Sequence, residues 1–172
     1  MDLTPVADVI SLSVFVAFAA VLVFASTQKF NLLWCTVIVV TILLAGTSEL
    51  LKDYLADPRP AGAANCGLFN GGGDASHENG MPSTHMAILT YLLVILVLFL
   101  PDKSFKKSIL WIIAGLWLAA MAWARYYYKN CHTPLQLLGG VGYGITFYIG
   151  TIFAGIIYII VYAMTCGKTC MD

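Results

Sequence analysis

Long apolar runs, broken by short polar segments, occupy most of the chain. Five of these runs are near or beyond the roughly 18 residues that a helix needs to cross a bilayer. They cover about residues 6–28, 30–51, 84–100, 107–124 and 136–164. The pattern predicts an all-α membrane protein, a polytopic bundle of about five transmembrane helices. Because the last run is long for one span, we expect that helix to tilt or to extend past the bilayer.

The composition supports a membrane setting. Of 172 residues, 60% are hydrophobic and only 10% are charged, whereas a soluble domain carries about 25% charged residues. Five spans use most of the chain, so we expect a single domain over residues 1–172. The bilayer is an expected partner, nucleic acid is not, and the sequence leaves the oligomeric state open. No basic residue precedes the first run, which predicts a retained helix rather than a cleaved signal peptide.

The polar segments between the runs alternate between the two sides of the membrane. With five spans, the N-terminus and residues 52–83 and 125–135 fall on one side. Residues 28–31, residues 101–106 and the C-terminal tail fall on the other. The residues with candidate chemistry all lie on the first side, so we expect them to form one group.

Three short clusters on that side carry the candidate chemistry. They are Lys52 to Arg59-Pro60, Pro82-Ser83-Thr84-His85, and Arg125 to His132. Together they supply three fixed cations, two histidines and a hydroxyl at membrane edges. Arginine offers a planar fork to two phosphate oxygens, and lysine offers a compact charge. Because phosphoryl transfer depends mainly on positioning and electrostatic stabilisation, this set predicts a site that binds and transfers a phosphate.

The spacing of the clusters resembles that of the type 2 phosphatidic acid phosphatase superfamily, a group of membrane lipid phosphatases. The chain has K-x6-R-P, then P-S-x-H, then an arginine and a distant histidine, all within residues 52–136. The resemblance implies that Lys52, Arg59 and Arg125 bind the phosphate or diphosphate of a lipid substrate. No metal or cofactor is expected, since these cations supply the charge that a metal would give.

The first cluster also has a plainer interpretation. Lys52, at the end of a span, could extend to the membrane surface. Arg59 could pair with Asp53 or Asp57. We favour phosphate binding because the other two clusters are present.

The second and third clusters carry the expected catalytic groups. Ser83 or Thr84 before an apolar run is typical of a helix N-cap, and a helix N-terminus also suits a phosphate. The resemblance implies that both residues contact the phosphate. It further implies that His132 attacks phosphorus to form a phosphohistidine and that His85 protonates the leaving lipid oxygen. An imidazole with an ordinary pKa of about 6.5 suits proton transfer around neutrality.

Two features depart from the resembled pattern. Thr84 stands where the family usually has glycine, which lets backbone approach a phosphate closely. Six residues, instead of five, separate Arg125 from His132. In a loop one extra residue is tolerable, whereas in a helix it would rotate Arg125 by about 100°. Together with Gln136, these departures leave open a degenerate homologue that binds lipid headgroups without turnover.

Gln136 stands where the family usually places an aspartate beside the nucleophilic histidine. Gln136 follows His132 by four residues, which places both side chains on one face of a helix. The side-chain carbonyl oxygen of Gln136 could then accept the Nδ1–H of the His132 ring. The run H-T-x-x-Q is similar to the dolichyl diphosphate phosphatase branch, which implies a polyprenyl diphosphate substrate. Phosphatidate or phosphatidylglycerol phosphate is the alternative. Thr133, Pro134 and Gln136 also match a capping box, in which the glutamine would serve only the helix backbone.

Lysines and cysteines predict which side of the membrane bears the clusters. Short cytoplasmic loops are enriched in Lys and Arg. Some lysines have no expected role in the phosphate site. One of them, Lys129, is on the cluster side, and five are on the other side: Lys29, Lys103, Lys106, Lys107 and Lys168. We therefore expect a site that faces the lumen, the periplasm or the exterior. An oxidising compartment there permits a disulfide between Cys66 and Cys131, although two free thiols suit the sequence equally well.

Overall fold

The computed structural model describes residues 3–27, 32–67, 69, 73–99 and 104–166. In these residues five α-helices and one π-helical turn follow one another, with no strand. They are α1 (Thr4–Thr27), α2 (Leu32–Leu55), α3 (Thr84–Phe99), α4 (Ser104–Trp123), η1 (Ala124–Tyr128) and α5 (Pro134–Cys166). The predicted all-α bundle of about five helices is confirmed.

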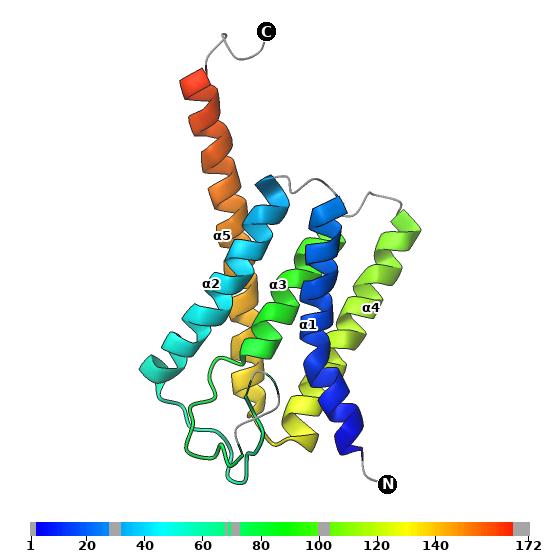
Figure 1. Cartoon of the computed structure of the whole chain (residues 1–172), viewed down its shortest axis with the longest axis vertical. Coiled ribbons are helices and arrows are strands. Elements are labelled where there is room, and N and C mark those ends of the chain that lie inside the picture. The colour runs from blue at the N-terminus through cyan, green and yellow to red at the C-terminus, as the bar shows by residue number, and fades with distance from the viewer. Residues whose placement is uncertain (1–2, 28–31, 68, 70–72, 100–103, 167–172) are drawn as a thin grey trace.

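Four of the helices are long and apolar enough to cross a membrane: α1, α2, α4 continued by η1, and α5. The fifth, α3, is apolar but has only 16 residues, about 24 Å of helix against a hydrocarbon core of about 30 Å. It packs against all four other helices and lies at the centre of the bundle (Figure 1). The hydrophobic core is therefore built around the shortest helix.

The longest helix, α5, has 33 residues and spans about 50 Å. Its C-terminal half extends past the other helices (Figure 1). Its first half packs closely on α3, because a Cβ at Gly140 or Gly144 would collide with the backbone carbonyls of Ser83 or Ala87. Small residues permit such close helix contacts in membrane proteins. The start of α3 and the start of α5 are thereby held side by side.

Residues 56–83 fold back on themselves at one end of the bundle. Isolated antiparallel bridges join Pro58 to Asn79 and Ala64 to Asp74. The backbone N–H of Gly80 also donates to Asp57 O at 2.7 Å. This connection is therefore shaped by its own backbone hydrogen bonds.

A disulfide joins Cys66 in this segment to Cys131, just before α5. The pairing that the sequence left open is confirmed. With Ala63 and Ala75, both buried, the two cysteines form a small core separate from the main one. The disulfide fixes the 56–83 segment against the connection between η1 and α5.

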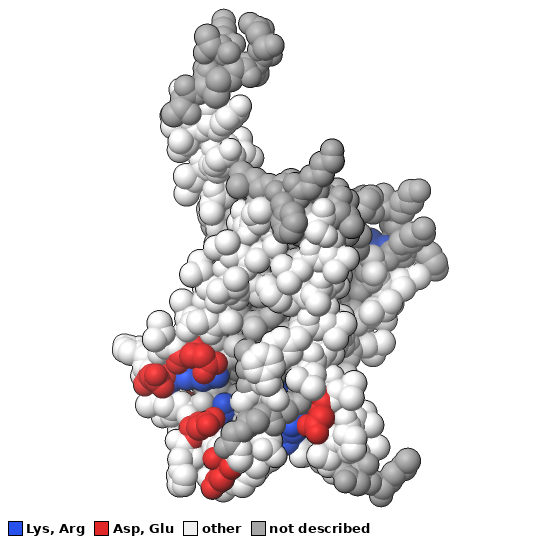
Figure 2. Space-filling model, in the orientation of Figure 1, with Lys and Arg blue, Asp and Glu red and all other residues white. Residues whose placement is uncertain are grey.

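The segments that the sequence places on the cluster side lie at one end of the bundle, as the number of runs predicts. Residues 56–83, residues 129–133 and the start of α1 share one end (Figure 1). On the face drawn in Figure 2, acidic and basic side chains gather at this loop end. Of the lysines expected on the opposite side, Lys29, Lys103 and Lys168 lie outside the described residues, as does the side chain of Lys106.

Candidate active site

A polar cavity of about 530 Å³ opens at the loop end of the bundle. Its wall combines the last turn of α2, the 56–83 segment, the start of α3, η1 and the connection to α5. Six of the eight residues expected in the site line it: Lys52, Arg59, Thr84, His85, Arg125 and His132. The predicted meeting of the three clusters is confirmed.

Lys52, in the last turn of α2, is turned inward and only 8% exposed. Its Nζ donates to Glu49 Oε1 at 2.7 Å. Glu49 lies one turn earlier on the same helix and also lines the cavity. The alternative in which Lys52 extends to the membrane surface is therefore wrong.

Arg59 is buried in the 56–83 segment. Its Nη1 lies 3.4 Å from Nε2 of His132. Its Nε lies 3.4 Å from Glu78 Oε2, so the alternative in which Arg59 pairs with Asp53 or Asp57 is wrong. The backbone N–H of Arg59 also donates to Glu78 O at 3.0 Å. The fold of this segment, rather than nearness in sequence, decides which acid Arg59 meets.

Arg125 is fully buried in η1. Its Nη2 donates to Cys66 O at 2.7 Å, while its Nε and Nη1 have no hydrogen-bond partner among the described residues. Arg59 Nη1 likewise donates to the backbone carbonyl of Cys131, at 3.3 Å. The carbonyls of the two disulfide-bonded cysteines thus hold both arginines. Buried, unpartnered donors on a permanently charged group suit an anion.

The stretch between Arg125 and His132 is partly π-helical and partly irregular. The backbone N–H of Lys129 donates to Ala124 O, five residues earlier, at 3.1 Å. A π-turn takes up one more residue than an α-turn. Arg125 remains on the cavity wall, so the extra residue relative to the resembled spacing does not turn it away.

His132 precedes α5 and is 1% exposed. Its Nδ1 is buried, with no hydrogen-bond partner in the described part of the chain. Burial first, and then the charges of Arg125, Arg59 and Lys52, lower the pKa of His132 well below its ordinary value of 6.5. The ring is therefore neutral at physiological pH and retains a lone pair.

None of the described hydrogen bonds of Gln136 goes to His132. Its Oε1 accepts the N–H of Thr133 at 3.1 Å, and its own N–H donates to Thr133 Oγ1 at 3.2 Å. Its Nε2 donates to Asp57 Oδ2 and to Pro58 O, both at 2.9 Å. The capping box is confirmed. The prediction that Gln136 orients the imidazole is wrong, because the start of α5 and the 56–83 segment engage its amide.

The start of α3 supplies two wall residues. The helix begins at Thr84, as expected, but the Thr84 hydroxyl turns to α2: it donates to Glu49 Oε1 at 2.8 Å and lies 2.9 Å from Ser48 Oγ. His85 follows it and is 2% exposed. Ser83 is not among the described residues that line the cavity, and its buried Oγ has no partner among them. The phosphate contact of Ser83 stays a prediction.

The sequence did not indicate the acidic part of the wall. Five further polar residues line the cavity: Glu49, Asp53, His77, Glu78 and Asn79. An acid three residues before Lys52 is a helical pair spacing, so Glu49 had a local signal. Glu78 had none, since only the folded 56–83 segment brings it to Arg59. No group of three or more His, Cys, Asp or Glu side chains in the searched residues could hold a metal ion.

Comparison with known families agrees with the geometry. The family model described as the PAP2 superfamily matches residues 32–165. This range runs from the start of α2 to the penultimate residue of α5 and includes every wall residue named above. No curated protein and no solved structure matches the chain. The match supports the resemblance at the level of the superfamily, whose members are phosphatases, and does not distinguish a branch. The chain therefore belongs to the PAP2 superfamily, and it is a membrane lipid phosphatase.

Proposed function

We propose that this phosphatase hydrolyses a polyprenyl diphosphate at the extracytoplasmic face of a membrane, through a phosphohistidine intermediate. The observation that carries the proposal is one cavity whose wall brings His85, His132 and three cations together from five parts of the chain. Histidine supplies a nucleophile and a proton donor, and the cations supply charge for the phosphate.

Lys52, Arg59 and Arg125 bind the phosphate that is removed. The Nε and Nη1 of Arg125, which have no hydrogen-bond partner among the described residues, are donors that phosphate oxygens would satisfy. The start of α3, at Thr84, adds the positive end of a helix dipole. These groups bind the charge that spreads over the phosphoryl oxygens in the transition state.

His132 is the nucleophile. The lone pair on its Nε2 attacks phosphorus, so that an N–P bond forms while the bond from phosphorus to the lipid-side oxygen breaks. The electron pair of the broken bond goes to that oxygen. The lowered pKa keeps the ring neutral. With its one proton on Nδ1, the ring has a lone pair on Nε2, so no proton has to leave Nε2 before attack. Arg59, whose Nη1 lies 3.4 Å from Nε2, stays beside the transferred phosphoryl group.

His85 serves first as acid and then as base. It gives a proton to the leaving oxygen, which releases the lipid monophosphate. It then takes a proton from a water molecule, whose oxygen attacks phosphorus as the N–P bond breaks. Inorganic phosphate leaves, His132 is neutral again, and one water has been consumed.

Gln136 supports the site without touching substrate. Its hydrogen bonds join Thr133, the residue after His132, to Pro58, the residue before Arg59. It thereby helps to set the nucleophile and one phosphate-binding arginine at a fixed separation. Its place in H-T-x-x-Q still supports a polyprenyl diphosphate, with phosphatidate or phosphatidylglycerol phosphate as the second candidate.

The orientation rests on two observations. By the expected order of the spans, the lysines that have no role in the three clusters fall mostly on the side opposite the site. The Cys66–Cys131 disulfide at the site suits an oxidising compartment. Both favour a cavity that faces the lumen, the periplasm or the exterior.

Phosphate release from detergent-solubilised protein in excess EDTA tests the function. The substrates are polyprenyl diphosphates, phosphatidate and phosphatidylglycerol phosphate, assayed in matched micelles. We expect release fastest from the polyprenyl diphosphates and absent in His132→Ala. Faster release from a glycerophospholipid phosphate would overturn the substrate, and loss of activity in EDTA would overturn metal independence. Binding without release from any of them would make the chain a headgroup-binding homologue.

A further inference from the structure

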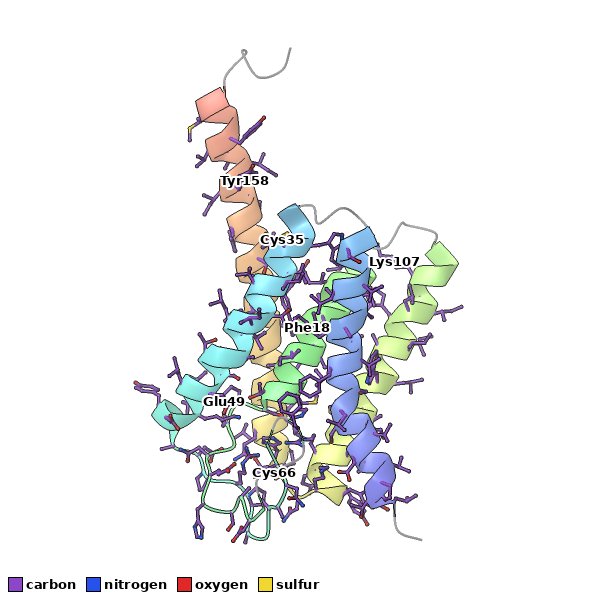
Figure 3. All side chains as sticks on the ribbon, viewed as in Figure 1. Phe18, Cys35, Glu49, Cys66, Lys107 and Tyr158 are labelled. Atoms are coloured by element: carbon purple, nitrogen blue, oxygen red, sulfur yellow. A yellow bond between two sulfur atoms is a disulfide. The ribbon has the colours of Figure 1, made fainter. Side chains whose placement is uncertain are left out.

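The carboxylate of Glu49 links two parts of the phosphate site. Its Oε1 accepts Lys52 Nζ at 2.7 Å and the Thr84 hydroxyl at 2.8 Å. Ser48 Oγ lies 2.9 Å from Thr84 Oγ1. A carboxylate only accepts, so the Thr84 hydroxyl is the donor in its contact with Glu49. The Ser48 hydroxyl also donates to Ala45 O at 2.8 Å. Figure 3 shows Glu49 at the loop end of α2.

The hydrogen bonds among Lys52, Glu49 and Thr84 depend on one another for a fixed geometry. An acid–base pair three residues apart on a half-exposed helix face is weak by itself, and the Glu49 side chain is 61% exposed. Lysine has a flexible stem and a charge that can point in many directions. A hydrogen bond from Thr84, which is 3% exposed, fixes the carboxylate from a second helix. The ammonium of Lys52 is then fixed beside the start of α3.

We infer that Thr84 and Glu49 are positioning residues that hold Lys52 toward the substrate phosphate. The inference rests on the proposed function only in giving Lys52 the role of a phosphate ligand. It accounts for a hydroxyl at residue 84: the side chain gives Glu49 a donor that a glycine lacks. The opposite idea, that Glu49 competes with phosphate for Lys52, predicts tighter phosphate binding once Glu49 is neutral.

Two measurements on the full-length protein in detergent test the inference. One is kcat/KM for farnesyl diphosphate, a short polyprenyl diphosphate. The other needs no turnover: the inorganic phosphate concentration that raises the thermal unfolding midpoint, since a ligand that binds the folded state stabilises it. The variants are Thr84→Val, which keeps the shape and removes the donor, Thr84→Ser, which keeps the donor, and Glu49→Gln.

We expect Thr84→Val and Glu49→Gln each to lower kcat/KM about tenfold and to require about tenfold more phosphate for the same shift. Thr84→Ser should stay within about twofold of the natural protein. The double variant should be no worse than the poorer single one, because both act through one contact. In a Lys52→Met background, Thr84→Val should change the phosphate requirement less than twofold.

Thr90→Val is the matched control, since Thr90 is also buried on α3 and lies outside the cavity. It should leave both measurements unchanged. Equal effects of Thr84→Val and Thr84→Ser, tighter phosphate binding in Glu49→Gln, or an undiminished Thr84→Val effect beside Lys52→Met would each overturn the inference. If the natural protein releases no phosphate from any lipid, the proposed function fails, and the phosphate measurement still decides whether this pair positions Lys52.

Discussion

The two ends of the bundle differ in what surrounds their internal space. At the loop end, a cavity of about 530 Å³ is walled largely by charged and polar side chains. Toward the other end, a cavity of about 260 Å³ lies among α1, α2, α3 and α4. Its described lining residues are all apolar or aromatic, among them Val21, Trp34, Leu92 and Trp117. One bundle thus holds a charged cavity and an apolar one.

The comparison indicates that the loop end is built for binding an anion and the apolar end for stability. Burying charge costs free energy unless the charge is partnered, yet the loop end keeps buried donors of Arg125 without partners in the described chain. Stability alone does not favour that arrangement, whereas a bound phosphate would satisfy it. The apolar end has packed residues such as Leu92, 2% exposed, whose removal leaves a void. Substitutions at the loop end should therefore cost activity, and those at the apolar end should cost stability.

The largest effect is expected for His132→Ala. Removing the nucleophile should lower phosphate release by roughly 10³-fold or more, as loss of a covalent nucleophile does in other hydrolases. The thermal unfolding midpoint in detergent should change less than in Leu92→Ala, because the ring borders a cavity and its Nε2 lies a long 3.4 Å from Arg59 Nη1. The reciprocal variant is Leu92→Ala, which should destabilise the protein by about 2 kcal/mol while the folded fraction keeps its activity. Residual activity within tenfold of the natural level in His132→Ala would remove His132 from the chemistry.

Arg125→Met should come next, with opposite effects on activity and stability. It should lower kcat/KM by roughly 10²-fold, since an oriented charge on the transition state is lost. The unfolding midpoint without phosphate should stay level or rise, because replacing a buried charge by an apolar side chain is often neutral or stabilising. Added phosphate should then stabilise the variant much less than the natural protein. A lower midpoint together with unchanged phosphate stabilisation would mean that Arg125 is structural.

The sequence predicted the apolar end better than the loop end, for a physical reason. Continuous apolar runs specify membrane helices locally, and the expected ranges agree with α1 to α5 to within a few residues. The start of α3 at Thr84 and the capping box of Thr133 and Gln136 are equally local, because each depends on residues within one helical turn. The meeting of the three clusters followed from the number of spans.

The partners inside the loop end could not be predicted in the same way. Arg59 meets Glu78 instead of a neighbouring aspartate because residues 56–83 fold back, and no periodic pattern specifies that path. Gln136 meets Asp57 across 79 residues, a contact that the docking of that segment on α5 determines. A hydrogen bond between distant residues depends on the packed fold, which a one-dimensional pattern does not encode.

A smaller effect is expected from opening the disulfide. Cys66 and Cys131 are 65 residues apart, and their carbonyls accept from Arg125 and Arg59. The double variant Cys66→Ala, Cys131→Ala should therefore weaken both phosphate ligands, lowering kcat/KM about tenfold, and should lose about 2 kcal/mol of stability. Cys35→Ala, at a cysteine of α2 outside the disulfide, is the control and should change neither. Equal activity of the double variant and the control would show that the arginines need no such support.

The smallest effect is a pH dependence that belongs to His132 alone. Burial, with help from Arg125, Arg59 and Lys52, lowers the pKa of His132 below 6.5 in the folded protein. In the unfolded chain the pKa returns to about 6.5. Above that pH the ring is neutral in both states. As the pH falls below it, only the unfolded chain gains the proton, so the free energy of unfolding decreases until the folded pKa is reached.

The difference in stability between the natural protein and His132→Asn isolates this dependence, because the other titrating groups are shared. That difference should be flat above about pH 6.5 and should shrink as the pH falls below it. The acid limb of kcat/KM should likewise lie below pH 6.5, because the free enzyme keeps its nucleophile neutral there. Arg125→Met should move this acid limb to higher pH, since it removes the charge that contributes most to lowering the pKa of His132. A stability difference that grows on acidification would mean that His132 binds a proton more readily in the fold than in the unfolded chain, and such a ring could not be the neutral nucleophile that the charged end of the bundle requires.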